Sequence, residues 1–360
     1  MNVADVLAGF DLGALDGAAP FTVASGPFAV ELRAREPLRS DLIAYFGTAV
    51  TDSAATDVVH VLDGQTLPDG IALRDWAREP GKTGRKDAIL DLADGRLIGK
   101  VRTGVGFLEA PGWHLAFGPV RDHTNQVINF VNTQLLNQAQ RAGWTMGHAA
   151  AVSDGRRTLA ISGLSGGGKS TSMLRMMDLP GTRFVTNDRL LFRPVAGGTE
   201  ALGIPKQPRI NPGTILGNRR LHKMLPPARL DALRAMADGA LWHLEEKHDL
   251  MVAEVYGPDR VAYAAPLTHY WVLNWSRDAS APAEVAEVNL TARTDLLDGI
   301  MKPRGPFYFS EDGTFDTEES SPDPAAYLTA LQNVAVFEVT GAVDFDALAA
   351  EGAALFGAPG

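Results

Sequence analysis

The chain of 360 residues contains no cysteine. Disulfide bonds, thiolate nucleophiles and cysteine-ligated zinc are therefore excluded. Hydrophobic residues make up 45% of the composition, yet no apolar run approaches the roughly 20 residues that span a bilayer. Residues 1–21 include no lysine or arginine, so the basic start of a signal peptide is missing as well. From these absences we expect a cytoplasmic protein.

The chain also has fewer positively charged than negatively charged residues. The chain has 33 lysine and arginine residues against 43 aspartate and glutamate residues, for a net charge of −10. Binding to nucleic acid phosphates needs clustered cations, so we expect no nucleic-acid partner and no anionic membrane partner. A triphosphate site can still be locally basic within an acidic protein.

The length is sufficient for two domains. A helix is expected near 125–142, where apolar residues recur at close to 3.6-residue spacing. We place the boundary just before it. The prediction is a smaller mixed α/β domain over 1–122 and a second α/β domain over 123–360. The first domain carries no readable motif, and acceptor recognition is suggested for it by position alone.

A P-loop stands at residues 163–170, with the pattern Gly-x-x-x-x-Gly-Lys-Ser. An apolar strand is expected before it and a helix after it, which is the context that this motif requires. The glycines let backbone N–H groups approach the phosphates, Lys169 reaches the β- and γ-phosphates, and Ser170 offers its hydroxyl to Mg²⁺. The residues expected to contact the nucleotide are Gly163, Leu164, Ser165, Gly166, Gly167, Gly168, Lys169, Ser170 and Thr171.

An acid suited to metal binding follows the P-loop. Asn187 and Asp188 end the next expected strand, and Asp188 comes 19 residues after Lys169. We expect that strand to lie beside the P-loop strand, which would put Asp188 near the γ-phosphate. Asp188 could hold Mg²⁺ or accept the proton of an acceptor hydroxyl, whereas Asn187 can only be a ligand. The alternative is an ordinary strand-end turn. The predicted metal ligands are Ser170, Asn187 and Asp188.

The segment 148–191 resembles the catalytic domain of HPr kinase/phosphorylase, a bacterial protein-serine kinase. The resemblance rests on His148, on the P-loop, and on the sequence Val-Thr-Asn-Asp at 185–188. It implies a P-loop kinase fold like that of phosphoenolpyruvate carboxykinase, a catalytic role for His148, and a homo-oligomer. Two positions depart from the family: Asn187 replaces the first aspartate, and Thr171 stands where glutamate is usual. These departures concern the acceptor and leave nucleotide binding untouched.

Two proline-stiffened basic segments lie further along the chain. Lys206 and Arg209 project from residues 204–213, and Arg304 lies within residues 302–306. A transferring phosphoryl group is stabilised by such cations, although either segment is also typical of a solvated surface loop. The predicted catalytic residues are Asp188, Lys169, His148, Arg209 and Arg304.

The sequence thus predicts an ATP-dependent, Mg²⁺-dependent phosphotransferase, a kinase acting on a hydroxyl of a protein or a small molecule. The identity of that acceptor is open. The alternative is an ATPase or nucleotide-dependent regulatory switch with no phosphorylated acceptor. A GTPase is disfavoured because the guanine-reading motif Asn-Lys-x-Asp is missing from the sequence.

Overall fold

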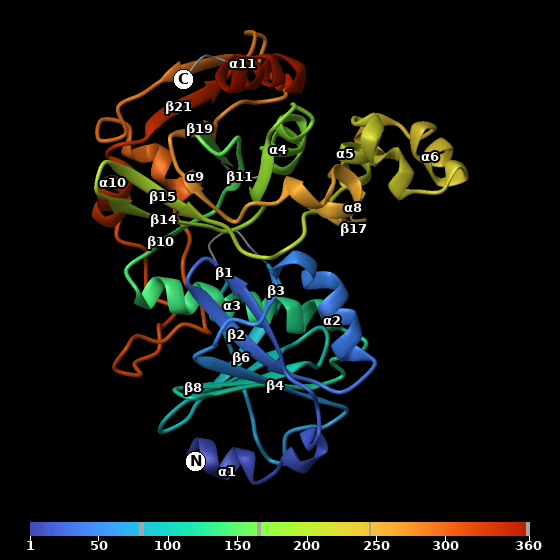
Figure 1. Ribbon diagram of the computed structural model, residues 1–360, viewed down its shortest axis with the longest axis vertical. Helices are drawn as coiled ribbons and strands as arrows, with labels where there is room; N and C mark the ends of the chain where they lie inside the picture. The colour runs from blue at the N-terminus through green and yellow to red at the C-terminus, as the bar shows by residue number, and fades with distance from the viewer. Residues whose placement is uncertain (79–82, 164–166, 245, 358–360) are drawn as a thin grey trace. The chain divides into compact units, whose positions relative to one another are not determined.

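Two compact units make up the chain in the computed structural model, which describes residues 1–78, 83–163, 167–244 and 246–357 (Figure 1). Unit 1 comprises Met1–Trp144 and Pro303–Pro322, and unit 2 comprises Thr145–Lys302 and Asp323–Gly360. Both combine helices with β-sheets, so the mixed α/β class predicted from the sequence is confirmed. Within the described residues, none of the helices has the combined length and apolarity that a bilayer crossing requires.

Unit 1 is built on a mixed sheet. Its described strands lie in the order β3-β1-β2-β4-β9-β8-β7-β6-β5, with β4 parallel to both β2 and β9. Its helical elements are α1 (Val3–Leu7), η1 (Leu12–Leu15), α2 (Leu38–Phe46), η2 (Gly47–Ala49) and α3 (Thr124–Arg141). The strands are β1 (Phe21–Ser25), β2 (Phe28–Arg33), β3 (Val50–Thr51), β4 (Asp57–Asp63), β5 (Arg74–Asp75), β6 (Asp87–Asp91), β7 (Arg96–Lys100), β8 (Gly106–Ala110) and β9 (Trp113–Gly118).

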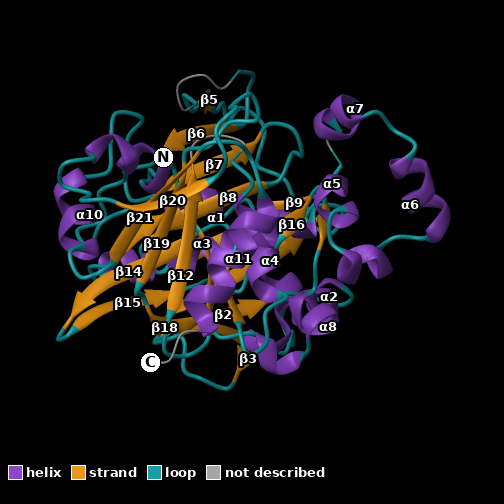
Figure 2. Ribbon diagram, turned by 90° about the horizontal axis from the view of Figure 1, so that it is seen from above, coloured by secondary structure: helices purple, strands orange, loops and turns teal. Residues whose placement is uncertain are grey.

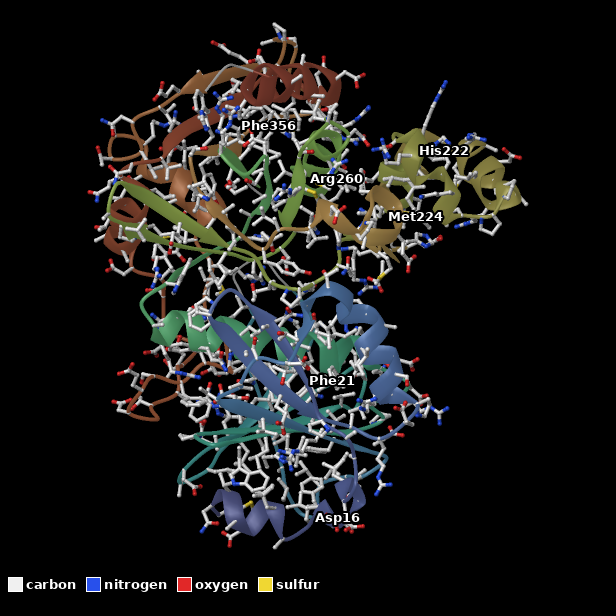
Figure 3. All side chains as sticks on the ribbon, in the orientation of Figure 1. Asp16, Phe21, His222, Met224, Arg260 and Phe356 are labelled. Carbon is white, nitrogen blue, oxygen red and sulfur yellow. The ribbon has the colours of Figure 1, made fainter. Side chains whose placement is uncertain are left out.

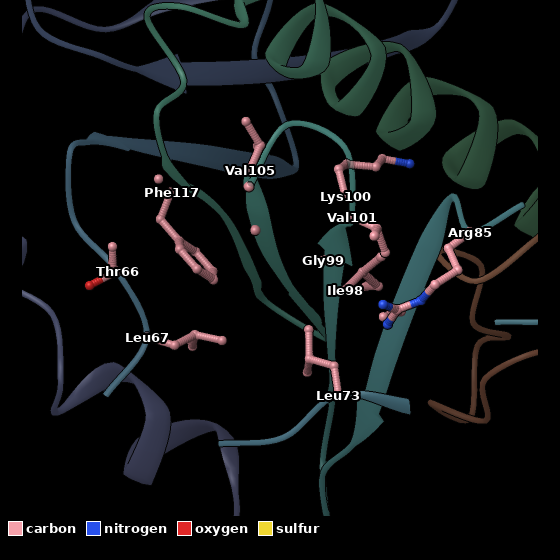
Figure 4. A pocket seen from close by; sticks show the side chains of 14 residues that line it. Thr66, Leu67, Leu73, Arg85, Ile98, Gly99, Lys100, Val101, Val105 and Phe117 are labelled. Atoms are coloured by element: carbon pink, nitrogen blue, oxygen red, sulfur yellow. The ribbon is translucent and has the colours of Figure 1, made fainter. Parts of the chain in front are cut away.

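Both faces of this sheet are covered. Helix α3 packs against β2 and β4, while α1 and η1 contribute Val6 and Leu15 to a cluster that also holds Leu108 and Leu115 of the sheet. A pocket of about 440 Å³ remains beside the glycines of β7, β8 and β9, and apolar side chains such as that of Leu73 line much of it (Figure 4).

Helix α3 belongs to unit 1, which differs from the boundary at 122/123 that the sequence suggested. The compact units divide after Trp144 instead. The reason is packing: the Phe130 ring on α3 lies 4.6 Å from Phe107 on β8 and 5.8 Å from Phe307. Phe307 brings residues 303–322 into the same core, so a segment remote in sequence completes unit 1.

Unit 2 contains the expected P-loop region. Its strands are β10 (Thr145–Gly147), β11 (Ala150–Ser153), β12 (Thr158–Gly163), β13 (Arg183–Thr186), β14 (Leu190–Val195), β15 (Gly198–Leu202), β16 (Arg209–Ile210), β17 (His248–Asp249), β18 (Ala264–Pro266), β19 (His269–Leu273), β20 (Glu284–Glu287) and β21 (Ala335–Thr340). Its helical elements are α4 (Lys169–Met177), α5 (Pro212–Leu216), η3 (Arg219–Met224), α6 (Pro227–Arg234), α7 (Asp238–His243), α8 (Val252–Tyr256), η4 (Pro258–Arg260), η5 (Thr294–Leu296), α9 (Leu297–Ile300), α10 (Pro324–Leu331) and α11 (Phe345–Gly357).

The central sheet of unit 2 has the described order β13-β11-β12-β19-β21-β20, and its strands β11, β12, β19 and β21 contribute buried side chains to a hydrophobic cluster on each face. Because side chains alternate along a strand, Leu159 and Ile161 of β12 face α4, whereas Ala160 faces the opposite layer. That layer is the second sheet, β10-β14-β15-β18, together with α9 and α10. Helices α4 and α11 lie side by side on the first face (Figures 1 and 2).

The short helices α5 and α6 extend outward from helix α4 within unit 2 (Figures 1 and 3), and α7 also packs against α5 (Figure 2). Arg260 fastens this region to α4, because its guanidinium donates to the carbonyl oxygens of Met177 and, at 3.1 Å, Leu179. These carbonyls lie at the helix end, where the partial negative charge favours a cation. The end of α4 is thereby held in a fixed place.

Unit 1 buries an ionised histidine. His114 on β9 is 1% exposed, and its Nδ1 lies 3.2 Å from Glu109 Oε1, while its Nε2 lies 3.8 Å from Asp57 Oδ1. Burial alone lowers the pKa of His114, but the two carboxylates outweigh it and raise the pKa to about 9. His114 is therefore a structural residue inside the core of unit 1.

We predict that His114 makes the stability of the chain sensitive to alkaline pH. A histidine pKa raised from 6.5 to about 9 stabilises the fold fully below pH 6.5, and this contribution is lost as pH rises through about 9. His114→Gln should flatten that decline, which we expect to be at most about 3 kcal/mol. The measurement is urea unfolding at a series of pH values.

His60→Gln serves as the control. Burial lowers the pKa of His60 on the neighbouring strand β4. The titration of His60 therefore changes the stability of the fold below pH 6.5 and not above it. An alkaline decline that persists unchanged in His114→Gln would rule out the buried ion pair as its cause.

Candidate functional site

The functional groups of unit 2 gather at one edge of its central sheet. Strand β12 runs parallel to β19, and β19 runs parallel to β21. Strand β13 is antiparallel to β11, which is antiparallel to β12, so β13 points the same way as β12. The carboxyl ends of these strands share one edge, the place where open α/β sheets bind ligands.

The strand before Asp188 is not the immediate neighbour of the P-loop strand, so that part of the prediction is wrong. Strand β11 lies between β13 and β12. The chain makes an antiparallel hairpin from β11 to β12 before it enters the P-loop. Because β11 is antiparallel to both β12 and β13, strands β12 and β13 run in the same direction. Asp188, which follows β13, therefore lies at the same edge of the sheet as the P-loop.

The described part of the P-loop needs its glycines. Leu164, Ser165 and Gly166 lie outside the described residues. A Cβ on Gly163 would lie 2.9 Å from the Cβ of Leu273. Gly168 has a φ of 80°, and a Cβ there would lie 2.7 Å from the Phe345 ring. A positive φ and close neighbours both favour glycine.

Helix α4 begins with Lys169, Ser170 and Thr171, all partly buried. Free N–H groups and the partial positive charge at such a helix start favour an anion. The Thr171 hydroxyl lies 2.9 Å from the Thr214 hydroxyl of α5. Burial lowers the pKa of Lys169, Arg189 and Lys302 add to this effect, and Asp188 opposes it.

Two connections between strands bring His148 and Asp188 together, and each connection links a strand of the central sheet to a strand of the second sheet. Strand β10 leads through His148 into β11, and β13 leads through Asp188 into β14. Because β10 pairs with β14 and β11 pairs with β13, the two connections run beside each other. His148 Nε2 consequently lies 3.5 Å from Asp188 Oδ1.

Cations hold both oxygens of Asp188. Arg189 Nη1 donates to Oδ1 at 2.7 Å, and Lys206 Nζ donates to Oδ2 at 3.1 Å. Burial by itself raises the pKa of Asp188, but Arg189, Lys206 and His148 more than offset it and hold the pKa well below its usual range. The carboxylate remains ionised, and about a third of it is exposed.

His148 is neutral at physiological pH. Burial lowers its pKa to about 4, with further lowering by Lys169 and Arg189, while Asp188 acts in the opposite direction. A neutral imidazole can donate one hydrogen bond and accept another. His148 therefore suits an orienting role beside Asp188.

The predicted metal ligands fit a magnesium ion by type. Mg²⁺ prefers oxygen donors and is commonly bound through one or two carboxylates together with phosphate oxygens. Asp188 supplies an ionised carboxylate. Asn187 Oδ1 is buried without a hydrogen-bond partner among the described residues, so it is available as an acceptor. No described cluster holds three or more metal-binding carboxylates or histidines, which a nucleotide-bound ion does not need.

The two predicted downstream arginines have other contacts. Arg209 Nε lies 3.0 Å from Asp249 Oδ1, across the β16–β17 pair. Arg304 belongs to unit 1, where its guanidinium lies 4.3 Å from the centre of the Tyr308 ring. Their predicted catalytic roles stay predictions. Lys206, three residues before Arg209, is the member of that segment that contacts Asp188.

Three residues at the site were not assigned from the sequence: Arg189, Lys302 and Trp275. Arg189 directly follows Asp188, so its place in the chain was a usable signal. Lys302 acts on the pKa of both His148 and Lys169. Trp275 donates its indole N–H to the Gly167 carbonyl at 2.9 Å. For Lys302 and Trp275, no local pattern indicates the contact.

Comparisons with known proteins add little to this geometry. No family model and no curated protein matches the chain. Among solved structures, the chain is similar to that of the Hpr(Ser) kinase/phosphatase from Coxiella burnetii, with 12% sequence identity. The match covers 59% of this chain and 95% of that chain, with a TM-score of 0.28.

We predict that Gly168→Ala destabilises unit 2 by roughly 2–4 kcal/mol, because the new Cβ combines an unfavourable φ with a collision against Phe345. Gly181→Ala is a matched control, since Gly181 also has a φ of 80° but no atom lies within 4 Å of the position that its Cβ would occupy. That control should cost about 1–2 kcal/mol. Urea unfolding measures both variants, and equal losses would contradict a steric role for Phe345.

Proposed function

We propose that this chain is an ATP-dependent phosphotransferase that moves the γ-phosphoryl group to a hydroxyl of a protein or small-molecule acceptor. One observation carries the proposal: Asp188 and a group of cations stand at the same sheet edge as the P-loop. The cations that act on Asp188 or His148 are Lys169, Arg189, Lys206 and Lys302. Together they complement the charge of a triphosphate. The motif resemblance of residues 148–191 to HPr kinase supports the same assignment.

The residues divide into phosphate binding and transfer. The described P-loop glycines and Lys169 bind the phosphates, and Ser170, Asn187 and Asp188 are the residues that would hold Mg²⁺. The ion, when bound, neutralises phosphate charge. Transfer breaks the bond between the γ-phosphorus and the β–γ bridging oxygen and forms a bond from phosphorus to the acceptor oxygen, and the acceptor proton leaves to Asp188 or to solvent.

Lys206 forms an ion pair with Asp188 in the structure, and we propose that it moves to the phosphates during transfer. It holds Asp188 Oδ2 at 3.1 Å, and the much greater negative charge of a triphosphate would compete for its ammonium group. Release of Lys206 frees Oδ2 for the metal or for the acceptor proton. The same movement brings a cation towards the charge that develops during transfer.

A switch or ATPase that uses water as acceptor is the second candidate. Its support is the same ion-pair network: Asp188 is tied to Arg189 and Lys206, and bound phosphates would rearrange it. Radiolabelled ATP added to the purified protein in its own cell extract distinguishes the two. Label appearing in another molecule, with acceptor-dependent ADP release, supports the kinase. ADP release that no acceptor accelerates supports the switch.

Asp188→Asn should bind nucleotide with an affinity within about threefold of wild type and lose transfer by about 10²–10⁴-fold, because the variant lacks the proton acceptor and charged metal ligand. Calorimetry with a non-hydrolysable ATP analogue measures binding, and the labelling assay measures transfer. Lys169→Ala, in contrast, should lose nucleotide affinity. If Asp188→Asn transfers phosphate at the wild-type rate, the role proposed for Asp188 in transfer is wrong.

Lys206→Met and Arg209→Met test which basic residue of the 204–213 segment acts in transfer. Methionine keeps most of the apolar stem of either side chain. We expect Lys206→Met to lower the transfer rate by about 10–100-fold and Arg209→Met to stay within about threefold of wild type. The comparison uses turnover at saturating ATP. If Arg209→Met lowers the transfer rate more than Lys206→Met does, Lys206 is not the basic residue of this segment that acts in transfer.

A further inference from the structure

Trp275 touches the backbone of the P-loop itself. Its Nε1–H donates a hydrogen bond to the carbonyl oxygen of Gly167 at 2.9 Å. Trp275 follows β19, and Leu273 at the end of that strand pairs with Gly163 at the end of β12. The parallel register therefore delivers the indole to the loop that leaves β12.

This hydrogen bond fixes the orientation of one peptide group. A trans peptide is planar, and its C=O and N–H point in opposite directions. With the Gly167 carbonyl directed at Trp275, the N–H of Gly168 points away from the indole. Anion cradles in P-loops depend on successive N–H groups that face the ligand. A glycine-rich loop has many other orientations available in the absence of such a contact.

A second aromatic residue supports the indole. Phe345 follows β21, the strand on the other side of β19, and its ring lies 5.3 Å from that of Trp275 at an interplanar angle of 87°. Phe345 also fills the space beside Gly168. It starts helix α11, which Asp346 joins to Arg175 of α4 at 2.9 Å. The aromatic pair is thus tied to the P-loop helix as well as to the sheet.

We propose that Trp275 is a positioning residue for a polyphosphate ligand: its indole N–H holds the Gly167–Gly168 peptide so that the Gly168 N–H faces the bound phosphates, and Phe345 keeps the indole in place. The inference rests on the proposed function, since it assumes that the P-loop binds phosphates. It assigns Trp275 to the phosphates and not to the base of the nucleotide.

Trp275→Phe removes the N–H donor and keeps an aromatic ring, whereas Phe345→Leu keeps the donor and leaves a smaller apolar side chain beside the indole. Calorimetry with two magnesium-loaded probes, ATP and inorganic tripolyphosphate, measures affinity in both variants. We expect Trp275→Phe to bind both probes about five- to tenfold more weakly, the effect of one lost hydrogen bond, and Phe345→Leu to change by less than about threefold. A loss confined to ATP, or wild-type affinity of Trp275→Phe for both probes, would overturn the proposal.

Lys169→Ala separates this proposal from the proposed function. If Lys169→Ala binds both probes like wild type, the phosphate site itself is wrong and both proposals fall. If Lys169→Ala loses binding while Trp275→Phe keeps it, only the role of Trp275 falls.

A measurement on the wild-type protein covers the case in which Trp275→Phe does not fold. The chain has six tryptophans, and ¹⁵N-labelled tryptophan gives one indole N–H signal for each. Saturation with tripolyphosphate should shift one of these signals and slow its exchange with solvent. If none of the indole signals responds while calorimetry shows binding, the proposal is overturned.

Discussion

The parallel alignment of β12, β19 and β21 is the constraint on which the site of unit 2 depends. These strands end at one edge of the sheet, so the segments that follow them must meet there. The P-loop follows β12, Trp275 follows β19 and Phe345 follows β21. Backbone hydrogen bonds in the ladder set this register, and burial of both faces makes a slip by one residue costly, since it would turn apolar side chains to the wrong side.

Electrostatics at this edge is dominated by the pairing of one carboxylate with several cations. Asp188 is bonded to Arg189 and Lys206, and it faces His148. Lys169 has a lowered pKa because it is partly buried beside further cations. A region that gathers positive charge inside a chain of net charge −10 is suited to a polyanion. The same ion pairs keep the cations ordered before such a ligand arrives.

Unit 1 is stabilised by a buried group of charged and polar side chains around His114. His114 lies between Glu109 and Asp57 inside the fold, and Gln134 of α3 donates to Glu109 Oε2 at 2.7 Å. The polar contacts therefore join β8 and β9 to the helix that covers them. A buried charge left without its partners is strongly destabilising, which favours one arrangement of the helix on the sheet.

Local sequence determined much of this protein. The motif at residues 163–170 predicts strand β12 and helix α4 on either side of it, apolar periodicity predicts α3, and Asn187-Asp188 is placed at a strand end, because each signal depends on neighbours along the chain. Only the tertiary structure decided that β11 separates β13 from β12, that α3 and residues 303–322 join unit 1, and that Lys206 rather than Arg209 meets Asp188. Those outcomes depend on strand pairing and packing between residues remote in sequence, which leave no local pattern.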